Sequence, residues 1–184
     1  MPPQTAAGKA VTVLRRAKPS EAEALTTLAI AAKSHWGYSP EFMAAARAEL
    51  TITPDDISSR PVIVAEQTTK TTTTTGGEGG GSPSLAAVYS IAGDPPRAEL
   101  SFLWVQPQKM GMGLGRLLWR DALRRAAEMG YEVMLVDADP NAEGFYARMG
   151  ADKVGESESG SVPGRMLPLM RAVVPSLEEL RREE

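Results

Sequence analysis

The sequence predicts one α/β domain of mixed topology, with a central sheet of six to seven strands and about four helices around it. Two observations support this prediction. Segments with strand and helix periodicity follow one another in the order β α α β β β α β α β β, which is typical of a mixed sheet with helices on both sides. The length of 184 residues suits one domain, since chains rarely divide below about 250 residues.

The N-terminal part is predicted to place one strand and two helices before a hairpin. The expected elements are a strand at 11–15, helices at about 20–33 and 40–50, and a turn or short helical piece at 53–56. Ser20 and Glu23 have the spacing of a capping box at the start of the first helix. Pro40 suits the first position of the second helix.

A compositionally unusual segment, 67–84, lies between predicted strands at 61–66 and 85–92. Its sequence, QTTKTTTTTGGEGGGSPS, has no large apolar side chain to offset the entropy of ordering it. Long surface insertions add little to the entropy cost of closing a loop. We therefore expect a mobile Thr/Gly-rich hairpin loop within the domain, not a domain boundary.

The C-terminal half alternates between strands and helices. The expected elements are a strand at 97–105, a helix at 114–129, a strand at 132–137, a helix at 140–149, and weaker strands near 151–156 and 166–174. Gly130 and Gly150 are suited to end the two helices. Asp139 is the better N-cap for the second, and Asn141 caps or braces the same turn. Residues 175–184 form a polar C-terminal tail.

Composition excludes several classes of function. With 20 Lys and Arg against 23 Asp and Glu, the formal charge of −3 gives no general attraction to nucleic acid or to an anionic membrane. The absence of cysteine excludes disulfides, zinc–thiolate sites and a cysteine nucleophile. Residues 1–10 hold no apolar signal segment, and no apolar run approaches the roughly 18 residues of a membrane span. We therefore expect a soluble, cytoplasmic protein.

Three alternating glycines, Gly111, Gly113 and Gly115, follow the strand at 97–105 in the stretch WVQPQKMGMGLGRLLW. Alternating glycines let successive backbone N–H groups converge, and the start of a helix adds unpaired donors and the positive end of its dipole. The loop therefore predicts a site for a phosphate or pyrophosphate.

An arginine stripe follows the loop. Arg116, Arg120 and Arg124 recur every four residues, which places them on one face of the helix. The stripe is either an anion-binding surface or a solvated face on which Asp121 pairs with Arg125, and the sequence leaves both open.

Two common nucleotide-binding loops do not match. A dinucleotide fingerprint requires G-x-G-x-x-G, but its third glycine would fall on Arg116. Fewer than 50 residues follow Asp137, too few for the remaining strands and a substrate domain. A Walker loop is excluded because the G-K-[ST] sequence is missing.

The glycine loop resembles that of the GNAT superfamily of acetyl-CoA-dependent N-acetyltransferases. Residues 105–107 (VQP) are similar to the V-x-P strand end of that family, and the glycines are similar to its [RQ]-x-x-G-x-[GA] loop. Met110 stands where Arg or Gln is usual, which removes one side-chain contact and leaves the backbone cradle intact.

A second motif, at residues 141–150 (NAEGFYARMG), resembles the family pattern N-x-x-A-x-x-F-Y-x-x-x-G-F. Phe145, Tyr146 and Gly150 align, whereas Gly144 and Ala151 replace the usual Ala and Phe. The chain is also similar to a bacterial set of members with K-x-H-W-G-Y and G-R-x-L-P motifs, here at 33–38 (KSHWGY) and 164–168 (GRMLP).

The resemblance implies a GNAT domain over residues 11–174 with a mixed, mostly antiparallel, twisted sheet. It also implies acetyl-CoA as co-substrate, no metal, and acetyl transfer to a primary amine of a small molecule by direct attack in a ternary complex. The alternative is an acyl-CoA-binding sensor domain without turnover. The expected partner is a small-molecule amine, with no nucleic acid and no membrane, and a homodimer is left open.

The resemblance also assigns roles to residues. Glu99 is the expected general base, on a strand face that alternation would share with Ser101, Leu103 and Val105. Tyr146 is the expected general acid for the departing thiolate. The implied cofactor-binding residues are Leu103, Trp104, Val105, Met110, Gly111, Met112, Gly113, Leu114, Gly115, Arg116, Asn141 and Tyr146. The implied acceptor-binding residues are His35, Trp36, Tyr38 and Arg165, the last as a charge clamp for an acceptor carboxylate.

Overall fold

A computed structural model of the chain describes residues 10–72, 78–80 and 82–182. One sheet has the strand order β1-β2-β4-β5-β6-β8-β7, and short β3 pairs with β2. The strands are β1 (Ala10–Arg16), β2 (Val62–Thr72), β3 (Glu78–Gly80), β4 (Ser84–Asp94), β5 (Arg97–Val105), β6 (Val133–Asp137), β7 (Asp152–Glu158) and β8 (Met166–Val173). Only β5 and β6 pair in parallel among these neighbours, which confirms the predicted mixed, mostly antiparallel sheet.

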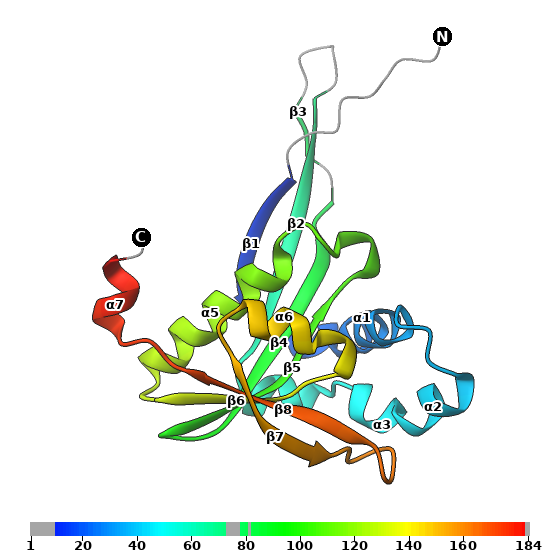
Figure 1. Cartoon of the computed structure of the whole chain (residues 1–184). Coiled ribbons are helices and arrows are strands. Elements are labelled where there is room, and N and C mark those ends of the chain that lie inside the picture. The colour runs from blue at the N-terminus through cyan, green and yellow to red at the C-terminus, as the bar shows by residue number, and fades with distance from the viewer. Residues whose placement is uncertain (1–9, 73–77, 81, 183–184) are drawn as a thin grey trace.

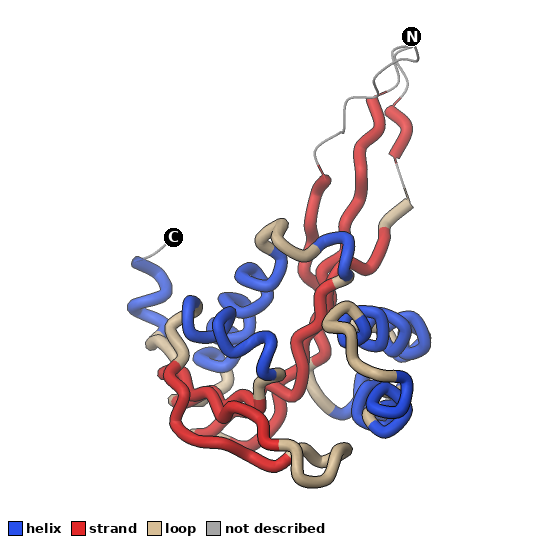
Figure 2. The backbone as a smooth tube through the Cα atoms, turned by 45° about the vertical axis from the view of Figure 1, so that its right-hand side comes forward, coloured by secondary structure: helices blue, strands red, loops and turns tan. Residues whose placement is uncertain are grey.

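Helices cover both faces of the sheet, as Figures 1 and 2 show, with α5 and α6 on one side and α1, α2 and α3 on the other. The helices are α1 (Ala22–Ser34), α2 (Pro40–Ala45), α3 (Arg47–Leu50), α4 (Pro54–Ser59), α5 (Leu114–Glu128), α6 (Glu143–Arg148) and α7 (Leu177–Arg182). The described part of the chain thus has more helices than the four expected, because the helix at 40–50 is divided in two and the segments at 53–56 and 175–184 each hold a short helix. None of these helices is long and apolar enough to cross a membrane.

The helix starts test the capping predictions. The expected capping box of Ser20 and Glu23 is wrong, because a 3₁₀ turn, Pro19–Glu21, already begins the helical segment. The Glu21 carboxylate accepts the backbone N–H of Lys18 at 2.7 Å. Pro19 suits the first position of this turn, because its fixed φ matches helical backbone and its missing N–H would have no helical partner.

The expected hairpin loop at 67–84 contains strand pairing in its described part. Strand β2 continues to Thr72, and 70–72 pair with β3 in an antiparallel ribbon that projects from the body of the sheet in Figure 1. Threonine is β-branched and favours extended backbone. The expectation of a loop was based on the low hydrophobicity of the segment and did not take this preference into account. Residues 73–77 and 81 lie outside the described part, and the expected mobility stays a prediction.

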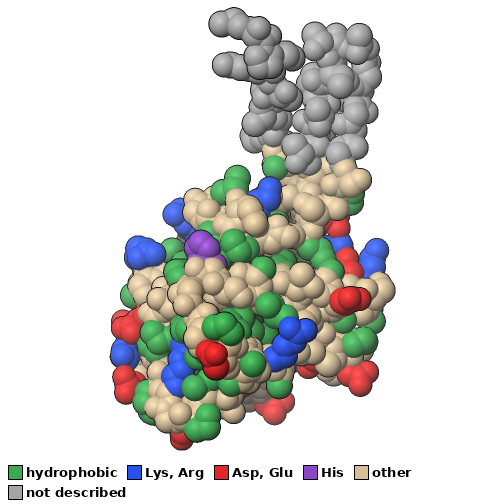
Figure 3. All heavy atoms as spheres, turned by 90° about the vertical axis from the view of Figure 1, so that its right-hand side faces the viewer, with side chains coloured by type: hydrophobic (Ala, Val, Ile, Leu, Met, Phe, Trp, Pro, Cys, Tyr) green, Lys and Arg blue, Asp and Glu red, His purple; other side chains and the backbone are tan. Residues whose placement is uncertain are grey.

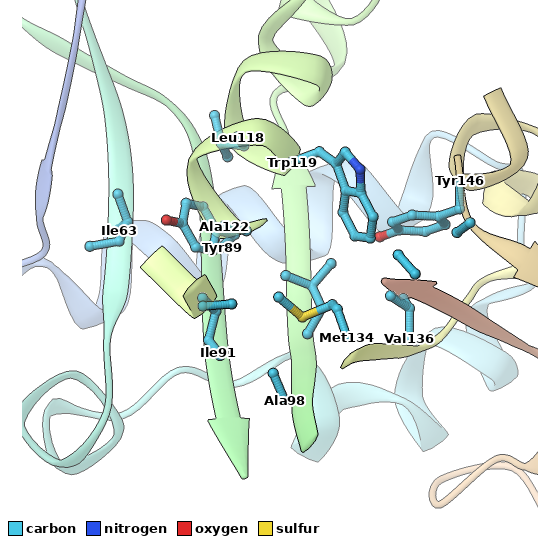
Figure 4. Close-up of a cluster of buried hydrophobic side chains, with 14 of the residues drawn as sticks. Ile63, Tyr89, Ile91, Ala98, Leu118, Trp119, Ala122, Met134, Val136 and Tyr146 are labelled. Carbon is cyan, nitrogen blue, oxygen red and sulfur yellow. The ribbon is translucent and has the colours of Figure 1, made fainter. Parts of the chain in front are cut away.

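The main core lies between the sheet and helices α5 and α6 (Figure 4). Its largest fully buried side chains include Trp119, Tyr89, Leu118 and Met134. A second, smaller core packs α1 and α4 against the other face of β2 and β4. These two layers fix the positions of the strands between which the candidate site opens.

A polar network also holds α5 to the sheet. The Tyr89 hydroxyl donates to buried Asp121 at 2.6 Å, and Arg125 Nε pairs with the same carboxylate at 2.8 Å. Arg124 pairs with Asp121 and with Glu128. The pairing of Asp121 with Arg125, one of the two alternatives for the arginine stripe, is therefore confirmed.

Candidate active site

Strands β5 and β6 separate after three paired positions, and a cavity opens between their diverging ends. The parallel register is Arg97↔Val133, Ala98↔Met134 and Glu99↔Leu135, and the pairing ends there. Beyond this fork lies a cavity of about 500 Å³. Its walls are residues 100–105 of β5, the glycine loop, residues 136–139 at the end of β6, and α6.

A bulge in β5 lies at the fork. The register between β4 and β5 passes from Ile91↔Leu100 to Ser90↔Phe102, which leaves Ser101 without a partner. A bulge of this kind bends a strand and exchanges the faces on which its side chains lie. Leu103 and Val105 accordingly pack on the same core as Leu100.

The bulge overturns one expectation about Glu99. Simple alternation placed Glu99 on the face of Leu103 and Val105, but beyond the bulge that side of the sheet carries Phe102 and Trp104, which pack towards α1. Glu99 lies at the last paired position before the fork, is exposed, and is not among the cavity-lining residues.

The open edge of β5 offers backbone donors to the cavity. The N–H of Gln106 donates to the carbonyl of Ala86 in β4 at 2.9 Å. Because successive N–H groups of a strand point in opposite directions, the N–H groups of Leu103 and Val105 face away from β4, towards the diverging β6. Leu103, Trp104 and Val105 all line the cavity, in agreement with their expected place.

The glycine loop forms one end of the cavity. Gly111 and Gly113 have φ values of +77° and +84°, a left-handed conformation that favours glycine, and Gly113 is the N-cap of α5. Within the described chain, no acceptor pairs with the backbone N–H of Gly111, Gly113, or the first three residues of α5. These donors and the positive end of the α5 dipole are suited to an anion.

The side chains of the loop divide between the cavity and the rest of the molecule. Met110, Gly111, Gly113, Gly115 and Arg116 line the cavity. Of the other two expected cofactor residues, Met112 is exposed and Leu114 is buried in the main core, so neither side chain lines it. Two cations that the sequence analysis did not single out, Lys109 and Arg148, also line it.

Tyr146 reaches the cavity from α6. The residue is 6% exposed, and its ring makes an edge-to-face contact with Trp119 at 5.4 Å between ring centres (Figure 4). It makes a second such contact with Phe145 at 5.0 Å. Burial raises the pKa of the Tyr146 hydroxyl, so the phenol is neutral near pH 7. No protein group in the described residues hydrogen-bonds this hydroxyl, which leaves its proton available to a ligand.

A buried charge cluster forms another wall, with Asp139 at its centre. Its carboxylate accepts hydrogen bonds from Lys33 Nζ at 2.6 Å, from the Tyr38 hydroxyl at 2.8 and 2.9 Å, and from the backbone N–H of Asn141 at 2.9 Å. Burial opposes ionisation of Asp139, but these bonds and the charge of Lys33 outweigh it and lower its pKa to about 2. Burial and the neighbouring carboxylate raise the pKa of Tyr38 to about 12.

Arg165 belongs to the same cluster. It donates to the Tyr38 hydroxyl at 2.7 Å and lies 3.4 Å from Asp139, and its guanidinium stacks 4.7 Å from the centre of the Phe42 ring. Tyr38 and Arg165, expected at the acceptor site, thus contact each other and do not line the cavity. Sequence reasoning treated Asp139 only as an N-cap, which it is, and did not assign a role to Lys33.

The remaining acceptor candidates lie at the end of α1. Trp36 is 40% exposed and lines the cavity. His35, the purple side chain in Figure 3, is exposed with its ring 5.4 Å from that of Trp36 in an edge arrangement, and it does not line the cavity. Asn141 lines the cavity and donates to both Tyr38 and Asp139.

Comparison with known proteins tests the resemblance to the GNAT superfamily. Residues 84–161 match the family described as acetyltransferase (GNAT) domain. No curated protein matches the chain. The resemblance to the GNAT superfamily is therefore confirmed over this segment, which contains β4, β5, the glycine loop, β6 and α6.

Solved structures show the same fold over nearly the whole chain. A GCN5-related N-acetyltransferase from Rhodopseudomonas palustris is 22% identical, with a TM-score of 0.65 over 88% of this chain and 94% of that one. The PaiA N-acetyltransferase from Thermoplasma acidophilum, solved with coenzyme A, is 16% identical, with a TM-score of 0.66 over 89% and 99%. A GNAT family acetyltransferase from Brucella melitensis, solved with acetyl-CoA, is 17% identical, with a TM-score of 0.54 over 91% of each chain.

Proposed function

We propose that this chain, which has the GNAT fold and matches the acetyltransferase (GNAT) domain over residues 84–161, is an acetyl-CoA-dependent N-acetyltransferase acting on a small-molecule amine. One observation carries the proposal. The cavity at the fork between β5 and β6 has unpaired backbone donors at one end and a neutral, buried tyrosine on its wall. Such a cavity suits a long, phosphate-bearing thioester.

The binding of the cofactor would use the glycine loop and the open edge of β5. The N–H groups of Gly111, Gly113 and the first turn of α5 would hold the pyrophosphate of acetyl-CoA. Lys109, Arg116 and Arg148, which line the same cavity, supply positive charge for the phosphates. The amides of the pantetheine arm would pair with the outward N–H and C=O groups of residues 103–105. Asn141 would contact the arm from the other side.

The reaction would be direct attack of a neutral amine on the thioester carbonyl. The ammonium form must first lose a proton, and Glu99, at the last rung of the fork, would receive that proton through water. The C–N bond then forms, and the carbonyl oxygen becomes an anion that the N–H of Val105 would stabilise. When the C–S bond breaks, the Tyr146 hydroxyl would give its proton to the sulfur, and the nitrogen would lose its second proton to water.

The acceptor would enter beside Trp36, whose exposed ring gives an apolar wall. His35 extends the same aromatic surface. The charge cluster around Asp139 contains two cations, Lys33 and Arg165, and only one carboxylate, Asp139 itself. This excess of positive charge favours a small polar amine that also carries a carboxylate.

An acyl-CoA sensor without turnover is the second candidate function. Met110, in place of the usual Arg or Gln, is the residue that favours it, because one contact to the cofactor is lost. Two measurements separate the candidates: calorimetric titration with acetyl-CoA, and release of free thiol over a panel of carboxylated and uncarboxylated amines. We expect saturable binding and thiol release with at least one amine. Binding without release would favour the sensor, and no binding would overturn both.

A further inference from the structure

The cavity is lined by six titratable side chains, and only one of them is a carboxylate free to accept a proton. The six are Lys109, Arg116, Asp137, Asp139, Tyr146 and Arg148. Three are cations, and the neutral phenol is a donor. Asp139 is fully engaged, because Lys33 pairs with it at 2.6 Å and holds it ionised. Asp137 has no cation within ion-pair distance in the described chain.

Asp137 is placed by the alternation of β6. Met134 and Val136 point into the main core beneath α5 and α6, so Asp137 lies on the opposite face of the strand. It follows the last paired residue of the fork, Leu135, by two positions. That offset places the backbone of Asp137 just beyond the point at which β5 and β6 separate, and the residue lines the cavity.

A hydrogen bond from β7, the strand beyond β8, orients the carboxylate. The hydroxyl of Ser157 in β7 donates to Asp137 Oδ1 at 2.6 Å. The other oxygen, Oδ2, has no hydrogen-bond partner among the residues that the structure describes. Asp137 is exposed and lines the cavity, and one of its oxygens has no protein partner in the described chain. A carboxylate without a cation of its own attracts an ammonium group.

We propose that Asp137 is a catalytic residue that contacts the acceptor amine and takes its first proton, an inference that rests on the proposed function. The ammonium nitrogen would donate to Oδ2, its N–H bond would break and the proton would move to the carboxylate, which leaves a lone pair on nitrogen for attack on the thioester carbon. The carboxyl group then returns the proton to water. The nitrogen gains one C–N bond, and coenzyme A leaves as a thiol.

Glu99 has a different place in this scheme. It pairs with Leu135 across the fork, one rung before Asp137 on the same face of the sheet, and lies outside the cavity wall. Both carboxylates are exposed, so water can carry a proton from one to the other. Glu99 is therefore the outer acceptor that receives the proton through water after Asp137.

The test compares three isosteric variants: Asp137→Asn, Glu99→Gln and, as a matched control, Asp152→Asn on the exposed part of β7. Steady-state thiol release is measured with the best amine of the panel, and the Kd for acetyl-CoA by calorimetry. We expect kcat to fall about 100- to 10,000-fold in Asp137→Asn, within the range of a positioned general base. We expect a smaller loss in Glu99→Gln, none in Asp152→Asn, and a wild-type Kd for acetyl-CoA in all three.

Each other result decides against the inference. Near-wild-type kcat in Asp137→Asn, with a large loss in Glu99→Gln, would overturn the role of Asp137 and leave the proposed function standing with Glu99 as the base. Weakened acetyl-CoA binding in Asp137→Asn would assign the residue to the cofactor instead. Failure of the wild-type protein to release thiol with any amine would overturn both the proposed function and this inference.

Discussion

Tyr146 is the residue whose environment bears most directly on the release of the thiol. Its ring packs edge-to-face on Trp119, and burial raises the pKa of its hydroxyl, so the phenol keeps its proton until a strong base forms beside it. A thiolate leaving a tetrahedral intermediate is such a base. Because the ring makes apolar contacts that phenylalanine would retain, removal of the hydroxyl separates the chemistry from the packing.

We expect Tyr146→Phe to lower kcat about 100- to 10,000-fold, the range for loss of a positioned general acid, while the Kd for acetyl-CoA stays within about twofold. Steady-state thiol release and calorimetry measure the two quantities. Tyr131→Phe is the matched control, because its hydroxyl donates to the Gly93 carbonyl at 2.7 Å and does not line the cavity. Equal kcat values for the two variants would remove Tyr146 from the mechanism.

Single residues also show where sequence reasoning stopped. Asp139 and Lys33 are 106 positions apart, so neither helix periodicity nor a local motif could pair them. Counting back from Tyr146 corrects the motif alignment: the pattern N-x-x-A-x-x-F-Y places its asparagine at residue 139 and its alanine at Ala142, and the expected alignment with Asn141 and Gly144 is wrong. The aspartate is therefore a departure from the pattern, and the basic residue in KSHWGY is the partner that it requires.

At the scale of elements, the contact between α5 and α6 joins the glycine loop to Tyr146, the proposed general acid. Gly115, in the first turn of α5, lies so close to Phe145 of α6 that an added Cβ would come within 3.2 and 3.3 Å of its ring. Phe145 is the chain neighbour of Tyr146. The lack of a side chain at Gly115 thus sets how near the glycine loop and the tyrosine can approach.

We expect Gly115→Val to force the two helices apart, to lower the free energy of unfolding by about 1–3 kcal/mol through overpacking, and to reduce kcat by moving Tyr146. Urea unfolding and thiol release give the two readouts. Gly155→Val in β7 is the control, because an added Cβ there meets nothing within 4 Å. If the two valine variants behave alike, the close approach of α5 and α6 is not required.

Most elements could be predicted from local patterns, and the exceptions have physical causes. The order of strands and helices, the Asp139 cap and the glycine loop depend on residues near one another in sequence, and all are present. The face of Glu99 was mispredicted because the bulge at Ser101 depends on pairing with β4, which periodicity does not report. The strand pairing of 70–72 with β3 was missed because the loop was inferred from the lack of apolar residues. Such a composition indicates that a segment is not buried, but it does not indicate which backbone conformation the segment adopts.

Across the whole molecule, the charge cluster joins three segments that are far apart in the chain. Lys33 and Tyr38 come from the α1–α2 region, Asp139 from the end of β6, and Arg165 from the turn before β8. The side chains of Lys33 and Asp139 are 10% and 9% exposed. A pair this buried is screened little by solvent, so it holds the wall of the cavity together even at high salt.

The depressed pKa of Asp139 makes stability depend on pH. Its ordinary value is 3.8 and its folded value is about 2, so the folded state binds this proton more weakly than the unfolded state does. The stabilisation is present above about pH 4 and is lost as the pH falls towards 2. A shift of this size corresponds to on the order of 2 kcal/mol at pH 7, of which about half is lost by pH 3. Hydrogen bonds also outweigh burial and lower the pKa of three other carboxylates: Asp121 accepts from Tyr89 and two arginines, Asp56 accepts mainly from Thr53, and Glu21 accepts from Arg15.

We therefore expect the wild-type free energy of unfolding to fall steadily between about pH 5 and pH 2, measured by urea titration followed through tryptophan fluorescence. The double variant Lys33→Met, Asp139→Asn removes both ions of the closest pair at once, and Arg165 keeps its hydrogen bond to Tyr38. Its loss of stability between pH 7 and pH 3 should be smaller than that of the wild type by about 1 kcal/mol. Asp152→Asn, on the exposed β7, should leave the wild-type profile unchanged. A double variant with the wild-type slope would show that this cluster does not control the acid stability of the fold.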